Sequence, residues 1–186
     1  MHIYAIGDIH GQIGLLRAAH DLIATDQARH GVAPVVHVGD LVDRGPDCAG
    51  VVELLRAGMA GGQDWIVLKG NHDRLMTGFL DGPDGRDPGL KGEHSWLHPR
   101  IGGGPTLQSY GVANPTDRPI AKVHADAVTA VPQAHRDFLA SRPVSFARGD
   151  LLFCHAGIRP TNPLLAQNAQ DLCLIRDGFL EVTDSF

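Results

Sequence analysis

Two carboxylates and an arginine stand together in one short segment of the sequence, Gly39-Asp40-Leu41-Val42-Asp43-Arg44-Gly45-Pro46. The apolar run 35–38 leads into it, which predicts a strand that ends in a tight loop. Taken alone, the segment is equally well explained as an ordinary turn, because Gly-Asp and Arg-Gly-Pro are common at turns. Three more polar segments make a chemical role the better interpretation: Gly7-Asp8-Ile9-His10-Gly11, Gly70-Asn71-His72-Asp73 and Cys154-His155-Ala156-Gly157.

These segments supply a mixed set of oxygen and nitrogen ligands, which suits divalent metals such as Mn²⁺, Fe²⁺ or Zn²⁺. Five candidates in separate loops favour two metals rather than one. We expect Asp8, His10 and Asp40 to hold the first metal. Asp40, Asn71 and His155 would hold the second, with the Asp40 carboxylate bridging the two. Two such ions can acidify a bridging water and clamp the oxygens of a phosphoryl group, so a phosphate-bearing substrate is predicted.

The residues beside these ligands suggest the remaining catalytic roles. His72 follows Asn71 but would point elsewhere, which suits a general acid that protonates the leaving oxygen. Asp43 would accept the other ring N–H of His72 and raise its pKa. Arg44 is placed for charge-assisted bonds to the phosphate, and Arg176 is a second candidate for that role. The remaining histidines are interpreted as solvated side chains: His2, His20, His30, His37, His94, His98, His124 and His135.

The polar segments follow strands in a regular alternation of strands and helices. The predicted strands are 2–7, 34–38 and 65–68, and each is followed by polar residues and then by a helix. The helices begin near residues 13, 49 and 71, and they end within 26–31, near 57 and near 79. Asn71 or Asp73 is expected to cap the third of them. This alternation predicts an α/β fold with a parallel sheet, whose ligands bind beyond the carboxyl ends of the strands.

The rest of the chain is less regular. The stretch 81–104, crowded with Gly, Pro and Asp, predicts a long excursion anchored at Trp96 and Leu97, and a surface loop is favoured over a substrate-facing lid. Helices are expected over 106–110 and over 125–140, with a break or a new first turn at Pro132. The runs 144–147 and 151–154 predict an antiparallel hairpin with His155 at its end.

Composition limits the classes of function. A chain of 186 residues that is 43% hydrophobic can bury a core as one domain over residues 1–186. The net charge of −5, without a run of Lys or Arg, argues against a nucleic-acid groove or an anionic membrane surface. No apolar stretch approaches the roughly 20 residues of a membrane span, and a strand begins near the N-terminus, so a cytoplasmic protein is expected. The pattern says nothing about the oligomeric state.

The four polar segments together carry a recognisable signature. Gly-Asp-Ile-His-Gly at 7–11, Gly-Asp-Leu-Val-Asp-Arg-Gly at 39–45, Gly-Asn-His-Asp at 70–73 and His-Ala-Gly at 155–157 resemble the calcineurin-like metallophosphoesterases, specifically the phosphoprotein phosphatase branch. Within it, Gly-Gly-Pro-Thr-Leu-Gln-Ser-Tyr-Gly at 103–111 and Leu-Cys-Leu-Ile-Arg-Asp at 172–177 are similar to bacterial serine/threonine phosphatases of the protein phosphatase 1 type.

This resemblance implies a β-sandwich flanked by helices and a dimetal phosphomonoesterase, usually activated by Mn²⁺, that acts on phosphoserine or phosphothreonine in proteins. It implies His72 as the acid and Arg44 and Arg176 on the phosphate. The metal ligands that it implies are Asp8, His10, Asp40, Asn71 and His155.

Two departures keep alternatives open. The form Gly-Asn-His-Asp at 70–73 is close to that of bacterial symmetrical diadenosine tetraphosphatases, whereas those enzymes tend to lack the carboxylate at Asp43. The family also has a later metal-ligand histidine, but no histidine follows His155 here. We therefore expect a C-terminally truncated domain that lacks its last strands, or a naturally short one. Its second metal site should be weaker, and a catalytically weak metal-binding remnant is a third interpretation.

Overall fold

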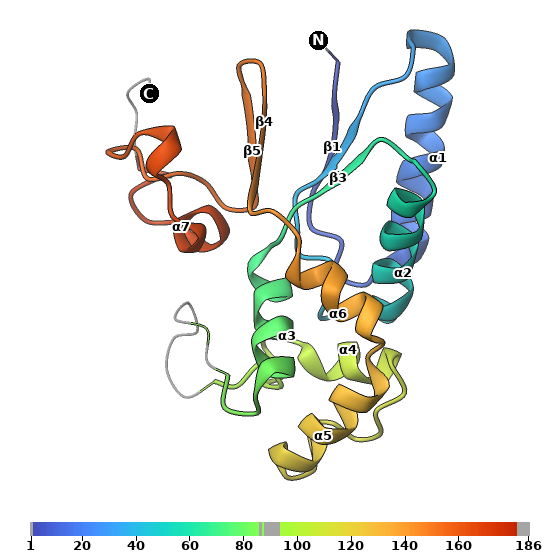
Figure 1. Ribbon diagram of the computed structural model, residues 1–186, viewed down its shortest axis with the longest axis vertical. Helices are drawn as coiled ribbons and strands as arrows, with labels where there is room; N and C mark the ends of the chain where they lie inside the picture. Colours follow the sequence, from blue (N-terminus) through green and yellow to red (C-terminus); the bar gives the residue numbers. More distant parts are fainter. Residues whose placement is uncertain (1, 86, 88–93, 182–186) are drawn as a thin grey trace.

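The computed structural model describes residues 2–85, 87 and 94–181 (Figure 1). Its first half alternates strands and helices as predicted. The elements are β1 (Tyr4–Ile6), α1 (Ile13–His30), β2 (Val35–His37), α2 (Cys48–Ala60), β3 (Trp65–Val67) and α3 (Asn71–Asp81). The predicted α/β fold and its three strand-loop-helix units are therefore confirmed.

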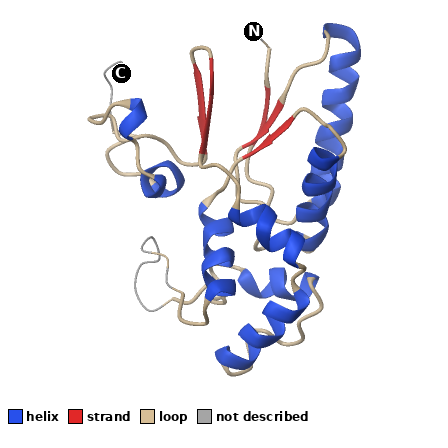
Figure 2. Cartoon of the chain, viewed as in Figure 1, coloured by secondary structure: helices blue, strands red, loops and turns tan. Residues whose placement is uncertain are grey.

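The three strands form one parallel sheet in the order β1-β2-β3. Ala5 pairs with Val36, and Val36 pairs with Ile66, so β2 is the central strand. The helices α1 and α2 lie on one side of this sheet, whereas the later hairpin stands on the other (Figure 2). Because parallel strands share one direction, the loops that follow β1, β2 and β3 all leave the same edge of the sheet. This edge collects the first three polar segments.

The second half begins with helices and ends in a hairpin and a short helix. Its elements are α4 (Gly103–Ser109), α5 (Ile120–Ala130), α6 (Gln133–Ala140), β4 (Ser145–Arg148), β5 (Leu151–Cys154), η1 (Leu164–Ala166) and α7 (Ala169–Leu174). The predicted hairpin is confirmed, with β4 and β5 antiparallel. The stretch 125–140 is two helices, and Pro132 is the N-cap of the second, in keeping with the break expected there. The elements η1 and α7 were not predicted, because neither shows a clear apolar period.

A hydrophobic core lies under the loops at the strand ends. Met76 of α3, Leu107 of α4 and Leu139 of α6 are fully buried in it. Leu41 and Val42, the two apolar residues of the central polar segment, are fully buried in the same core. Full burial of each such side chain contributes about 1.5–3 kcal/mol. The loop is therefore anchored from below, and this fixes where the flanking carboxylates lie.

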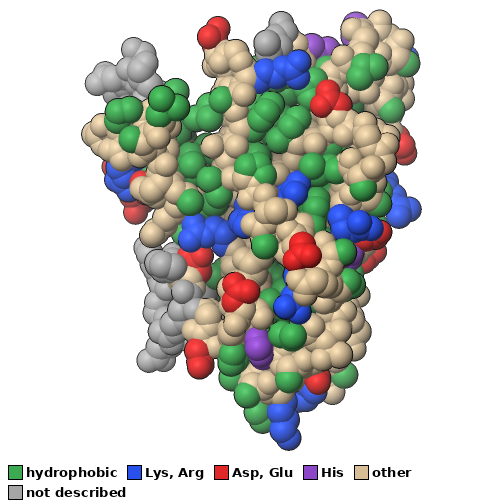
Figure 3. All heavy atoms as spheres, in the orientation of Figure 1, with side chains coloured by type: hydrophobic (Ala, Val, Ile, Leu, Met, Phe, Trp, Pro, Cys, Tyr) green, Lys and Arg blue, Asp and Glu red, His purple; other side chains and the backbone are tan. Residues whose placement is uncertain are grey.

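The hairpin side of the molecule is less covered. Leu151 and Leu152 of β5 are exposed, as are Leu164, Leu165 and Leu180 further along the chain. Figure 3 shows hydrophobic side chains gathered on the upper part of this face. Within the described residues the strands are β1 to β5, which form the three-stranded parallel sheet and the two-stranded hairpin. None of the helices that the structure describes is long and apolar enough to cross a membrane.

The predicted excursion over 81–104 is described only in part, since residues 86 and 88–93 lie outside the described residues. Trp96 and Leu97 are buried and belong to the core, so the predicted anchor point is confirmed.

Two histidines that were expected to be solvated are buried, and those predictions are wrong. His37 is fully buried because it lies on the central strand β2. His135 of α6 is 7% exposed, and its ring contacts the Tyr110 hydroxyl and the Glu53 carboxylate.

Candidate functional site

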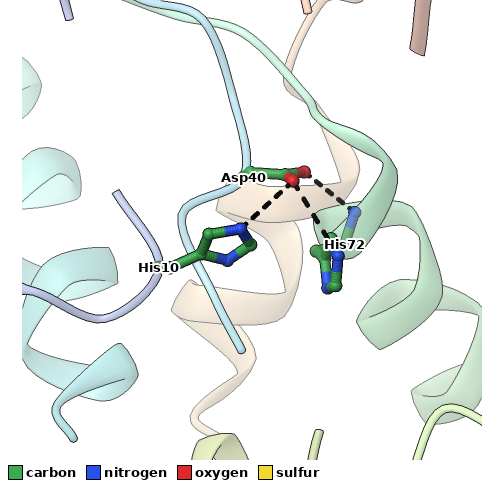
Figure 4. A group of neighbouring side chains, drawn as sticks. All are labelled: His10, Asp40 and His72. Carbon is green, nitrogen blue, oxygen red and sulfur yellow. Dashed lines mark hydrogen bonds and ion pairs between the residues drawn. The ribbon is translucent and has the colours of Figure 1, made fainter. Parts of the chain in front are cut away.

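The side chains from the four polar segments meet around Asp40. Its Oδ2 lies 3.5 Å from His10 Nε2 and 3.4 Å from His155 Nε2. The Nε2 of His72 lies 4.0 Å from the same oxygen. In Figure 4, His10 and His72 approach the Asp40 carboxylate from different elements, the loop after β1 and the start of α3. A carboxylate that faces three imidazole rings is an arrangement suited to divalent metals.

Asp8 and Asn71 complete the set of five predicted ligands. Asp8 lies between two rings, with Oδ2 3.9 Å from His10 Nε2 and Oδ1 3.8 Å from His155 Nδ1. The Oδ1 of Asn71 lies 3.0 Å from His155 Nε2. The structure thus brings all five side chains together, although their roles as ligands stay predictions.

Two overlapping groups of possible ligand atoms share Asp40. His10, Asp40 and His72 form one group, and Asp8, Asp40 and His155 form the other, with the atoms of each group within 4.8 Å of one another. Carboxylate and imidazole donors suit Mn²⁺, Fe²⁺ or Zn²⁺, so the residues present fit two divalent ions. The grouping differs from the predicted one in two respects: Asp8 falls with His155, and His72 falls within the first group.

Backbone carbonyls orient two of the rings. The Nδ1 of His10 lies 2.7 Å from the Val42 carbonyl oxygen, and the Nδ1 of His155 lies 3.1 Å from that of Val38. Each Nδ1–H donates to its carbonyl, which leaves the Nε2 lone pair directed toward Asp40. A second partner that fixes the tautomer in this way is characteristic of histidines that bind metals.

The loops reach this geometry with unusual backbone angles. His10, Asp40, Asp43 and Arg44 all have positive φ, at 43°, 51°, 73° and 67°. Non-glycine residues adopt this region at a cost, and such residues concentrate at functional sites. Gly39 has a φ of 100°, and a Cβ there would clash with the Gly70 nitrogen. Only glycine permits this approach of the two loops.

His72 is held on both sides of its ring. Its Nδ1–H donates to Asp43 Oδ2 across 2.7 Å, and its Nε2 accepts from Arg44 Nη2 across 2.9 Å. Burial lowers the pKa of His72, but the hydrogen bond to Asp43 and the charges of Asp40 and Asp43 outweigh it and raise that pKa above its ordinary value. Arg44 also donates from Nη1 to His10 Nε2 across 3.0 Å, so one guanidinium spans the two rings.

Asp73 ties the loops to α3. Its carboxylate accepts the Leu41 N–H across 2.9 Å and the Gly70 N–H across 2.8 Å. Gly70 is the N-cap of α3, so Asp73 reaches back to the helix start as a capping side chain. Burial and the charge of Asp40 raise the pKa of Asp73. The sequence suggested only the helix cap, whereas the structure adds the link to Leu41.

The similarity of the chain to a known protein family agrees with this arrangement of the loops. The model of the calcineurin-like phosphoesterases matches residues 1–172. The chain belongs to this family. The calcineurin-like resemblance of the four polar segments is therefore confirmed.

Among curated relatives of this chain is serine/threonine-protein phosphatase 1 of Salmonella typhimurium, which is 35% identical over 75 residues. That match covers 40% of this chain and 31% of the relative. The symmetrical bis(5'-nucleosyl)-tetraphosphatase of a Janthinobacterium species is 29% identical over 160 residues, which is 86% of this chain and 45% of that protein. The chain thus spans less than half the length of either relative.

A solved structure has the same fold. It is the crystal structure of a candidate diadenosine tetraphosphatase, with a TM-score of 0.56 and 22% identity. The match covers 91% of this chain and 56% of that one. At this identity the likeness concerns the fold alone, and it agrees with the predicted metallophosphoesterase fold.

The structure does not bring every predicted residue to the site. Arg176 is exposed just after α7, and within the described residues no hydrogen bond or ion pair joins its side chain to the ligands. Conversely, Trp96 and Thr106 contact Asp43 directly, and sequence reasoning gave them no role at the site. Nothing in the sequence pattern links them to Asp43, because they lie 53 and 63 residues away.

Proposed function

We propose that this protein is a dimetal phosphoesterase that hydrolyses phosphomonoesters, with phosphoserine and phosphothreonine in proteins as the favoured substrates. The observation that carries the proposal is the Asp40 carboxylate facing three histidine rings, one of which is paired with Asp43. A metal site beside an oriented imidazole is what metal-assisted hydrolysis with a general acid requires.

The residues that would hold the ions are Asp8, His10, Asp40, Asn71 and His155, with Asp40 shared. We propose Mn²⁺ as the metal, with Fe²⁺ or Zn²⁺ as alternatives that the same donors accept. When bound, such ions supply Lewis acidity, which activates water and neutralises charge on the phosphoryl oxygens.

The protein's own side chains supply the proton and orient the phosphate. With Nδ1–H donating to Asp43, Nε2 of the neutral ring accepts from Arg44. When the ring is protonated and Arg44 binds the phosphate instead, the proton that His72 can transfer is on Nε2, the ring atom that faces Asp40. In this proposal that proton goes to the leaving oxygen. Arg44 already directs two guanidinium nitrogens toward the site, and a bound phosphate would accept from them in place of the rings. Arg176 stays a second candidate for the phosphate.

Cleavage of dinucleoside polyphosphates is the second candidate. The match of 29% identity over 86% of this chain to a symmetrical tetraphosphatase favours it. The buried Asp43 beside His72 favours the phosphomonoesterase, because the resemblance associates a carboxylate at this position with the protein phosphatases.

The first experiment follows phosphate release from 4-nitrophenyl phosphate across a titration of Mn²⁺, with an EDTA blank. We expect metal-dependent release. On phenyl phosphate, whose leaving oxygen needs a proton, we expect His72→Ala to lower kcat by roughly 10²- to 10⁴-fold, the usual contribution of a general acid. His30→Ala is the control, since His30 is exposed at the end of α1. No release at saturating Mn²⁺ would contradict the proposal and favour a metal-binding remnant.

The second experiment separates the substrates. A phosphoserine peptide, a phosphothreonine peptide and diadenosine tetraphosphate are supplied at equal concentration, and the products are resolved by chromatography. We expect a higher kcat/KM on the phosphopeptides. A higher value on the dinucleotide, with two nucleoside diphosphates as products, would make the tetraphosphatase the correct assignment.

A further inference from the structure

Asp43 receives more hydrogen bonds than its pairing with His72 requires. The indole Nε1–H of Trp96 lies 3.0 Å from Oδ1 and 2.9 Å from Oδ2. The hydroxyl of Thr106 donates to Oδ1 across 2.7 Å. Asp43 and Thr106 are fully buried, and Trp96 is 2% exposed. With His72 included, three side chains donate to one carboxylate in a buried site, where such bonds are strong and the loss of one is costly.

The two extra donors come from parts of the chain remote from the strand ends. Trp96 lies in the stretch that precedes α4, and Thr106 lies on α4 itself. The Thr106 oxygen also accepts the backbone N–H of Asp43 across 2.9 Å. One hydroxyl therefore binds both the backbone and the carboxylate of Asp43, a residue with a φ of 73°.

We propose that Trp96 and Thr106 are positioning residues for the acid, and this inference rests on the proposed function. They fix the direction of the Asp43 carboxylate. Because Asp43 Oδ2 accepts from His72 Nδ1, the carboxylate in turn sets the plane of the imidazole ring and directs Nε2 toward Asp40. An acid that is displaced from the leaving oxygen loses much of its effect even when its chemistry is intact.

A purely structural role is the competing explanation. The Trp96 ring packs against Phe79 with centroids 5.0 Å apart and against Gly103. The two explanations predict different kinetics. Loss of acid catalysis slows esters with poor leaving groups more than esters with good ones, because a good leaving group departs without a proton. A structural disturbance of the site lowers the rate of hydrolysis of all esters by the same factor.

The test compares Thr106→Val, which removes the hydroxyl at similar volume, with Thr106→Ser, which retains it, and with Trp96→Phe. Thr77→Val and Trp65→Phe are matched controls, because neither side chain touches Asp43. Each folded variant is assayed on 4-nitrophenyl, phenyl and alkyl phosphates at saturating Mn²⁺. We expect Thr106→Val and Trp96→Phe to lower kcat on phenyl phosphate about 10- to 100-fold, as loss of a supporting partner usually does. On 4-nitrophenyl phosphate the loss should be smaller, and Thr106→Ser should restore the wild-type dependence on the leaving group.

A spectroscopic readout needs neither metal nor turnover. The chain has two tryptophans, so the spectrum of ¹⁵N-labelled protein holds two indole N–H signals, which Trp96→Phe assigns. A hydrogen bond to a charged carboxylate moves such a signal downfield. We expect the Trp96 signal to move upfield in Asp43→Asn, while the Trp65 signal stays in place.

The outcomes separate the inference from the function on which it rests. An equal loss of kcat on all esters in folded Thr106→Val would overturn the inference and leave the phosphoesterase standing, as would an unmoved Trp96 signal. If Trp96→Phe does not fold, the threonine variants alone decide. Failure of the wild-type protein to release phosphate from any ester would overturn the proposed function, and the inference with it.

Discussion

Two histidine clusters lie next to the same parallel sheet and differ in what surrounds them. At the candidate site, His10 and His72 meet edge to face with centroids 4.8 Å apart, beside three aspartates. Between α1 and the sheet, His20 and His37 bring their Nε2 atoms within 2.8 Å, and His20 stacks on Trp65 with centroids 4.3 Å apart. We call the second group, made of His20, His37 and Trp65, the flank cluster.

The neighbours decide what these rings can do. For His72, the hydrogen bond and the charges of the nearby carboxylates together have a larger effect than burial, so its pKa is raised. In the flank cluster, burial and the neighbouring His20 lower the pKa of His37 to about 4, so this ring stays neutral. Residue type alone therefore does not make a functional histidine. The carboxylates that the loops bring beside it do.

The largest expected effect comes from removing the carboxylate that both ligand groups share. Asp40→Ala should lower Mn²⁺-dependent turnover by more than the roughly 10²- to 10⁴-fold that loss of a general acid costs, because both groups lose a ligand. Calorimetry with Mn²⁺ should show weaker binding. A variant that retained wild-type affinity and turnover would show that Asp40 is not the shared ligand.

The next effect concerns stability in acid and tests the flank cluster. The pKa of His37 falls from its ordinary value of 6.5 to about 4 in the folded protein, so the unfolded chain takes up the proton first. The free energy of unfolding should therefore fall as the pH drops from 6.5 toward 4, with a His37 contribution of roughly 3 kcal/mol. Urea unfolding in EDTA at several pH values measures it. The His37→Leu variant should lose less free energy of unfolding over this pH range than the wild-type protein. If the two proteins lose the same amount, His37 is not the group responsible.

A smaller effect is expected at Arg44, which spans the two rings of the site. Arg44→Lys retains the charge but loses the planar pair of donors, so kcat/KM should fall by about 10- to 100-fold, the equivalent of one or two charge-assisted bonds. Steady-state kinetics on phenyl phosphate measures the change. If Arg176→Lys gives the greater loss, the phosphate is held mainly by that second candidate.

The smallest expected effect concerns His20 and tests whether the flank cluster is independent of the candidate site. His20→Phe keeps a ring on Trp65 but removes the hydrogen bond to His37, which should cost about 1 kcal/mol of stability. Turnover on 4-nitrophenyl phosphate should stay unchanged, because His20 touches none of the candidate ligands. A loss of kcat in a folded His20→Phe protein would mean that the clusters are coupled through β2.

Local patterns predicted much of this molecule. The β1, β2 and β3 strands, the helices after them and the β4–β5 hairpin follow from short apolar runs and turn residues. The convergence of the first three polar segments follows from the parallel sheet, since strand ends of one direction share an edge. The solvated interpretation of His37 failed because a single polar residue in a strand carries no sign of whether the strand is central.

Strand and helix periodicity and turn chemistry act over a few residues, so the order of amino acids is enough to predict which side chains stand at the ends of the strands. Which of these side chains meet depends on the packing of the folded chain. His155 reaches Asn71 from 84 residues away, and Trp96 reaches Asp43 from 53. Such contacts depend on how the hairpin and α4 pack against the sheet and its loops, and packing is a property of the whole chain.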